Sequence, residues 1–205
     1  MAPALVIGLL SIAFGGTHIG LAARPLRSRL VARLGEGGYR AVFTATAAVT
    51  FAALVRVYAT VRFEGAAGLA LATAPARWLL ITAIGSGIVL LFLGIIAYPR
   101  TPMALFASRV GTPYGVERIS RHPFFAGLAI VALAHVLLAT RLVGAVLMSA
   151  IALLAIAGAL HQDRKLLAER GRAYGEYLAA TSFLPFAAVL AGRQRIVWSE
   201  IGWPM

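Results

Sequence analysis

Four histidines are the side chains that could most readily bind a metal ion, because the 205-residue sequence contains no cysteine. The absence of cysteine excludes disulfides, thiolate metal ligands and a cysteine nucleophile. The sequence also contains no glycine-rich phosphate-binding loop, no helical metalloprotease motif and no serine elbow. Histidine, methionine and oxygen ligands remain, so the possible chemistry depends on where the histidines lie.

The elements that must position these histidines are membrane helices. Hydrophobic residues make up 60% of the sequence and charged residues 13%, about half the charged share of a soluble domain. Five apolar runs reach the length of about 20 residues that a bilayer core requires; they cover residues 3–23, 41–61, 77–98, 122–140 and 142–160. We therefore expect an all-α integral membrane bundle of about five transmembrane helices that forms one domain over residues 1–205.

Three further features of this bundle are predicted. The last two runs should form a tight helical hairpin at Thr140 and Arg141. Residues 163–180 place leucines and tyrosines at helical spacing among charges, which predicts an amphipathic helix along the inner membrane surface. Small residues that let neighbouring helices pack closely occur in the third run, at Gly85, Ser86, Gly87 and Gly94.

The net charge of +12 does not indicate nucleic-acid binding, because no basic stretch carries the stacking aromatic or base-reading side chains that such binding needs. Most of the 19 lysines and arginines fall in connections on one side of the bundle if the helices alternate in direction. Positive charge accumulates on the cytoplasmic side of membrane proteins. The chain is therefore predicted to be multi-pass in the inner (cytoplasmic) membrane, among membrane lipids, with its N-terminus out and its C-terminus in.

Three of the four histidines fall at one depth, near the inner surface of the bilayer. His18 lies about five residues before the inner end of the first helix, His122 begins the fourth and His161 follows the fifth. His135 lies about 20 Å deeper than His122 on the same helix, at ~1.5 Å per residue, so these two cannot share one iron. His18 and His122 can do so if their helices are neighbours, with His161 as the substitute. The three histidines indicate a metal or haem site.

A second interpretation of the same region stays open. Five polar residues could line a pocket for a charged cofactor at the membrane surface: Arg121, His122, Asp163, Glu169 and Tyr177. In such a pocket Arg121 would pair with a carboxylate by donating two N–H groups to it. Spacing alone does not decide between this pocket and a haem site.

Motifs spread over nearly the whole chain resemble the NnrU family. They lie at residues 17–22, 34–40, 118–123, 133–135, 163–166 and 181–194. The first contains His18 in a His-Ile-Gly-Leu-Ala run, and the third contains the Arg-His-Pro run of His122. The fourteen-residue run 181–194, which ends in Gly-Arg-Gln, is the most specific, and it is similar to the branch of the family that contains the 15-cis-zeta-carotene isomerases.

The resemblance implies a multi-helix membrane protein that binds haem b and isomerises the 15-cis double bond of zeta-carotene without net redox change. The haem iron would be reduced, and the substrate would be an apolar polyene that enters from the bilayer. The family's axial ligands would correspond to His18 and His122, which agrees with the pair that depth favours. We further expect Arg118 and Arg121 to pair with the haem propionates, and His161 remains the substitute ligand.

Two alternative functions remain. The run Arg-His-Pro-Phe-Phe-Ala-Gly that begins at Arg121 also resembles the isoprenylcysteine methyltransferases, which implies a membrane methyltransferase that uses S-adenosylmethionine. This resemblance covers only the C-terminal half and leaves His18 without a role. The other alternative is a non-catalytic haem-binding factor for denitrification, with which NnrU members are associated.

Overall fold

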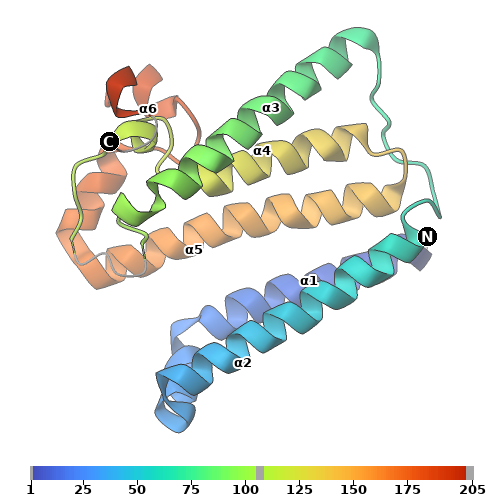
Figure 1. The fold of residues 1–205 in the computed structure, drawn as a ribbon, viewed down its shortest axis with the longest axis horizontal. Coiled ribbons are helices and arrows are strands. Elements are labelled where there is room, and N and C mark those ends of the chain that lie inside the picture. The colour runs from blue at the N-terminus through green and yellow to red at the C-terminus, as the bar shows by residue number, and fades with distance from the viewer. Residues whose placement is uncertain (1, 105–108, 202–205) are drawn as a thin grey trace. The chain divides into compact units, whose positions relative to one another are not determined.

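The computed structural model describes residues 2–104 and 109–201, and it is built from helices (Figure 1). The helices are α1 (Ala2–Ala22), α2 (Arg24–Val61), α3 (Ala74–Ala97), α4 (Pro123–Leu138), α5 (Leu142–Ala180) and α6 (Ala187–Leu190). The short 3-10 turns are η1 (Tyr98–Arg100), η2 (Gly115–Arg118) and η3 (Trp198–Glu200). These described residues contain no β-strand, so the predicted all-α class is confirmed.

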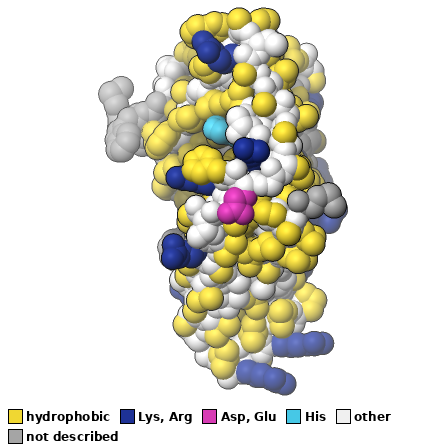
Figure 2. Space-filling model, turned by 90° about the vertical axis from the view of Figure 1, so that its right-hand side faces the viewer, with side chains coloured by type: hydrophobic (Ala, Val, Ile, Leu, Met, Phe, Trp, Pro, Cys, Tyr) yellow, Lys and Arg dark blue, Asp and Glu magenta, His cyan; other side chains and the backbone are white. Residues whose placement is uncertain are grey.

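Four of these helices, α1, α2, α3 and α5, are long and apolar enough to cross a membrane. The fourth helix of the sequence prediction, α4, is apolar but has 16 residues, fewer than the ~20 of a typical span. Large apolar side chains are exposed along these helices, for example Leu5, Phe51, Phe92 and Leu153. Figure 2 shows hydrophobic side chains spread over much of one face, with a few charged side chains among them. Extensive exposed apolar surface marks membrane contact, and the chain is a multi-pass membrane protein.

The chain divides into two compact units. The first comprises residues 1–73 and 135–150, and the second comprises residues 74–134 and 151–205. In the first unit α1 and α2 lie antiparallel. Phe14 packs on Phe51 with ring centroids 5.5 Å apart, and His18 packs on Phe43 at 5.1 Å. The later residue on α1, His18, thus contacts the earlier residue on α2, Phe43, which is the pattern of an antiparallel helical hairpin.

The connection between the first two predicted spans, residues 24–40, is mostly helical. Only Ala23 separates the two helices, residues 24–34 are helical, and Gly35 then breaks the helix with φ 71° and ψ 171°. A positive φ costs glycine no steric strain. Arginine and leucine, which dominate residues 24–34, are good helix formers, so this charged run forms a short helix.

The predicted tight hairpin between α4 and α5 is confirmed. Only residues 139–141 separate the two helices. Segment 66–71 runs beside them, and the N–H of Gly68 donates to the carbonyl oxygen of Thr140 at 3.0 Å. A β-carbon on Gly68 would strike the carbonyl oxygen of Ala139, so this approach requires glycine.

Glycines bring α3 and α4 into close contact in the second unit. A β-carbon on Gly87 would lie 2.9 Å from both the carbonyl oxygen of Gly127 and a methyl carbon of Val131. One on Gly94 would lie 2.9 Å from Cα of Phe124. The same atom on Gly85 would meet no described atom within 4 Å. Two of the three glycines expected to mediate packing therefore face α4.

Gly87→Ala is expected to lower the free energy of unfolding by about 1–3 kcal/mol, because the new methyl group overlaps α4. Gly85→Ala, two residues earlier on the same helix, adds the same methyl group to open space and gains up to about 1 kcal/mol of helix propensity. Thermal unfolding of the two purified variants beside the wild type measures the difference. Equal melting temperatures for both variants would contradict the close contact between α3 and α4.

The predicted amphipathic segment 163–180 is helical but bent. Its first part continues α5 past the apolar stretch, and Gly171 then breaks the helix with φ 53° and ψ −130°. Leu166, Tyr174 and Tyr177 pack together in a buried cluster on which Met103 also packs. Three apolar side chains of this segment, Leu166, Tyr174 and Tyr177, are therefore buried in the second unit, whereas Leu167 is exposed.

Candidate functional site around Asp163

Asp163 takes part in four hydrogen bonds with three side chains of the second unit. Its Oδ2 atom accepts from Nε and Nη2 of Arg121, at 3.0 and 2.8 Å. Its Oδ1 atom accepts from the Tyr174 hydroxyl and pairs with Nε2 of His122, both at 2.7 Å. Asp163 is 8% exposed and His122 is 3% exposed, so the cluster is buried.

The contacts of Asp163 determine where His122 carries its proton. A carboxylate that takes two N–H groups of an arginine is ionised, and an ionised carboxylate only accepts hydrogen bonds. Nε2 of His122 must therefore donate to Asp163. In the neutral imidazole this leaves Nδ1 with the free lone pair. His122 could bind a metal through Nδ1, and Asp163 would orient the ring from behind, as carboxylates do at many metal-bound histidines.

The segment before α4 is held by the most specific sequence motif, residues 181–194. The Ser120 hydroxyl donates to the carbonyl oxygen of Phe183 at 2.8 Å, and the N–H of Arg121 donates to the carbonyl oxygen of Ser182 at 2.8 Å. The two motifs are about sixty residues apart in the chain, yet they meet through the Ser120 hydroxyl and through backbone groups. The run 181–194 thus helps to position the arginine and histidine of the site.

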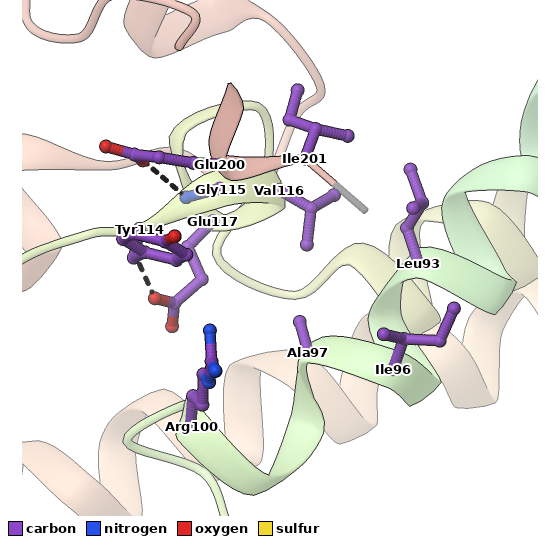
Figure 3. Close-up of a pocket in the computed structure, with 10 residues that line it drawn as sticks. All are labelled: Leu93, Ile96, Ala97, Arg100, Tyr114, Gly115, Val116, Glu117, Glu200 and Ile201. Atoms are coloured by element: carbon purple, nitrogen blue, oxygen red, sulfur yellow. Dashed lines mark hydrogen bonds between the residues drawn. The ribbon is translucent and has the colours of Figure 1, made fainter. Parts of the chain in front are cut away.

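Arg118, one of the two arginines expected to pair with haem propionates, has a carboxylate partner within the chain. Its Nε donates to Oε2 of Glu200 at 2.7 Å and its Nη2 donates to Oε1 at 3.0 Å. Its Nη1 donates to the amide oxygen of Gln194 at 3.0 Å. Glu200 also accepts from the N–H of Gly115 at 2.8 Å (Figure 3). The propionate pairing of Arg118 stays a prediction.

Glu117 is a second buried carboxyl group, 4% exposed. It accepts hydrogen bonds from the Tyr177 hydroxyl at 2.8 Å and from the N–H of Tyr114 at 3.1 Å. Burial raises the pKa of Glu117, and these two hydrogen bonds, which lower it, offset the rise only in part. The rings of Tyr177 and Tyr174 stack with their centroids 5.6 Å apart, so the Glu117 pair is adjacent to the Asp163 cluster.

Two hollows of the second unit adjoin these clusters. One, of about 130 Å³, is lined by Gly94, Tyr98, Thr101, Met103, Arg121, His122, Pro123, Phe124, Phe125 and Gln162. It is smaller than the roughly 300–1,000 Å³ of most ligand pockets. The other lies between the end of α3 and η2, and in Figure 3 Arg100, the last residue of η1, extends toward the carboxyl group of Glu117. The first hollow is the one that His122 borders.

His18, the other predicted ligand, lies on α1 in the first unit. Its ring packs against Phe14 and Phe43, with centroid distances of 5.6 and 5.1 Å. Its Nδ1 atom is buried, and no atom of residues 2–104 or 109–201 forms a hydrogen bond with it. Buried polar atoms nearly always have a partner, so this nitrogen is one that could bind a metal ion.

The remaining histidines take other places. His161 is half-buried on α5, two residues before Asp163, and His135 lies in the last turn of α4. In the part of the chain that the structure describes, no three histidine, aspartate or glutamate side chains could hold a metal ion together. A haem needs only one or two axial ligands from the protein. The pairing of His18 with His122 stays a prediction, because they belong to different units.

The predicted polar pocket is found in part. Arg121, His122 and Asp163 do come together, whereas Tyr177 bonds to Glu117.

Three residues of these clusters were missed by sequence analysis: Tyr174, Glu117 and Glu200. A signal for the two glutamates was present, since the chain has only seven acidic residues and ionisable groups in an apolar chain are usually paired.

The fold and this site define a multi-pass helical membrane protein whose arginine-histidine pair is fixed by a buried aspartate. The chain belongs to the NnrU family, because the family model, described as NnrU protein, matches residues 5–204. The resemblance inferred from the motifs is thereby confirmed.

Two curated relatives carry the name 15-cis-zeta-carotene isomerase, chloroplastic. The chain is 29% identical to the Zea mays protein over 202 residues and 28% identical to the Arabidopsis thaliana protein over 205 residues. Each comparison covers 94% of this chain and 52% of the relative, so the chain spans about half the length of these relatives. No solved structure matches the chain.

Proposed function

We propose that the chain is a haem b-dependent membrane isomerase that acts on the 15-cis double bond of zeta-carotene, in carotenoid biosynthesis, without net redox change. The observation that carries the proposal is the similarity to two proteins of that name over 94% of the chain. The apolar surface of the helices supports it, since a polyene dissolved in the bilayer can reach such a surface without crossing water. The proposed location is the inner membrane, with the N-terminus out and the C-terminus in, from the distribution of positive charge.

Two histidines are suited to hold the haem. His18 has a buried Nδ1 atom without a partner among the described residues, and His122 keeps Nδ1 free while Asp163 occupies Nε2. Each imidazole therefore has a nitrogen that could serve as an axial ligand. When bound, reduced haem iron would supply a metal centre that can interact with the π electrons of the 15-cis double bond and lower the barrier to rotation about it.

The residues around His122 would orient this ligand and keep water away from it. Asp163 fixes the tautomer and the direction of the ring, and Arg121 balances the charge of Asp163. The rings of Phe125 and Phe183 lie 6.0 and 6.3 Å from the imidazole. These two aromatic rings could offer apolar contacts to a hydrocarbon substrate.

The methyltransferase alternative receives less support. It would need Arg121 and His122 to bind S-adenosylmethionine, and both side chains are committed to Asp163. The family match extends over residues 5–204, whereas the methyltransferase resemblance covers the C-terminal half alone. We therefore do not propose it.

The test uses the full chain, expressed with haem supplied and purified in detergent. We expect a Soret band, split visible bands on reduction, and conversion of 15-cis zeta-carotene by the reduced protein, followed by chromatography of the isomers. A well-folded but colourless protein would overturn the haem assignment. A protein with the haem spectrum that leaves zeta-carotene unchanged would overturn the isomerase and favour the non-catalytic haem-binding factor.

A further inference from the structure

The bend between α1 and α2, residues 23–35, contains two arginines whose side chains contact no other described residue through a hydrogen bond, ion pair or ring. Arg29 and Arg33 are exposed, and neither has an ion pair, a hydrogen bond from its side chain or a ring contact within residues 2–104 and 109–201. Glu36, the one acidic residue between positions 24 and 40, is already bound by Arg27 at 2.8 Å and by Arg40 at 3.4 Å. The positive charge of Arg29 and Arg33 is therefore not balanced locally.

The two arginines lie beside a row of leucines on the same short helix. Arg29 and Arg33 are four residues apart, which places their β-carbons roughly 5–6 Å from each other on one side of the helix. Three leucines follow the same four-residue spacing: Leu26, Leu30 and Leu34. Leu26 and Leu34 are 40% and 50% exposed. A basic pair next to a partly exposed apolar row is the pattern of a helix that lies in a membrane surface.

Side-chain contacts also hold the bend together. Arg27 donates to both carboxylate oxygens of Glu36 at 2.8 and 3.0 Å, and its guanidinium lies 5.2 Å from the centre of the Tyr39 ring. The Tyr39 hydroxyl in turn donates to the carbonyl oxygen of Leu21 at 3.2 Å. The bend joins two helices that are long and apolar enough to cross a membrane, so it must lie at the level of the lipid headgroups.

We propose that Arg29 and Arg33 form a binding site for the phosphate of an anionic phospholipid of the surrounding bilayer. Two guanidinium groups on adjacent turns supply planar, paired N–H donors that match phosphate oxygens. The leucine row contacts the acyl chains of the same lipid, which a free phosphate ion would leave unused. This site is independent of haem and of isomerisation.

The test measures binding of fluorescent phosphatidylglycerol and phosphatidylcholine to the purified full chain in detergent micelles. Arg29→Gln with Arg33→Gln is expected to weaken phosphatidylglycerol binding by roughly thirtyfold, the effect of two arginines near an anionic surface. Each single variant should weaken it by about fivefold, which keeps the test open should the double variant fail to fold. Phosphatidylcholine should bind more weakly than phosphatidylglycerol to the wild type.

The matched control is Arg56→Gln with Arg62→Gln, which removes the same charge from exposed arginines at the other end of α2. It should leave phosphatidylglycerol binding within about twofold of the wild type, since these arginines lie beyond the reach of screened charge interactions at the bend. Equal loss in both double variants, or no loss in either, would overturn the site. Displacement of the lipid by inorganic phosphate, but not by chloride at the same ionic strength, would show that the two arginines bind a free phosphate ion. That result would overturn the proposed lipid-binding site.

Discussion

Replacing Asp163 with alanine is expected to lower the free energy of unfolding by about 3–5 kcal/mol, because it leaves buried charged and polar partners without their acceptor. Arg121 would lose both of its carboxylate contacts, and His122 and Tyr174 would lose one each. The side chains of Arg121 and His122 are only 15% and 2% exposed, so water cannot readily replace the lost carboxylate.

Two milder variants separate the charge of this cluster from its hydrogen bonds. Asp163→Asn keeps an oxygen that can accept from His122 but loses the charge that Arg121 pairs, so an intermediate loss is expected. Tyr174→Phe removes one hydroxyl donor and should cost about 1 kcal/mol. Denaturant unfolding in detergent micelles gives the order of the three. An Asp163→Ala variant as stable as Tyr174→Phe would contradict the view that the cluster holds this unit together.

The wild-type cluster also predicts the tautomer of His122. Nitrogen NMR of haem-free protein labelled at histidine distinguishes a hydrogen on Nε2 from one on Nδ1. The Asp163 contact requires the hydrogen on Nε2. Finding it on Nδ1 would remove Nδ1 as a metal ligand and would overturn the orientation proposed for the haem-binding histidine.

The helices could be predicted from sequence because apolar length is a strong signal in a membrane chain. The hairpin at Thr140 and Arg141 followed from two apolar runs that nearly touch. The short helix at residues 24–34 was not predicted, because its arginines marked it only as a charged connection, although its helix propensity favours a helix until Gly35. The bend at Gly171 was missed because a glycine within an amphipathic pattern does not reveal whether its φ is positive.

The site was harder to predict than the fold, because it depends on contacts between distant parts of the chain. The Arg-His-Pro run and Asp163 were both recognised, and one interpretation placed them in the same pocket. Spacing could not show that Asp163 forms a hydrogen bond with His122, 41 residues earlier in the chain. It also could not show that Glu200 accepts one from Arg118, 82 residues earlier. Nothing local marks Tyr174 as a donor to Asp163, since a tyrosine at helical spacing is more often a packing residue.

His18→Ala and His122→Ala are each expected to abolish isomerisation and to remove the low-spin haem spectrum, because a bis-histidine haem needs both axial ligands. His161→Ala should keep the spectrum, since His161 is the substitute and not the predicted ligand. His135→Ala is the matched control, because it removes an imidazole in the last turn of α4, whereas His122 directly precedes the first turn, about 20 Å away along the helix axis. Absorption spectra of the four purified variants, oxidised and reduced, provide the comparison.

His18→Ala is the sharper of the two ligand variants. His122 belongs to the Asp163 cluster, so removing its side chain lowers stability whether or not it binds iron. Nδ1 of His18, in contrast, has no hydrogen bond to lose among the described residues. The haem-free His18→Ala protein should therefore melt within a few degrees of the haem-free wild type, and its loss of the low-spin spectrum would report ligation alone. A low-spin spectrum that survives in His18→Ala but disappears in His161→Ala would assign the pair to His122 and His161 and remove α1 from the haem site.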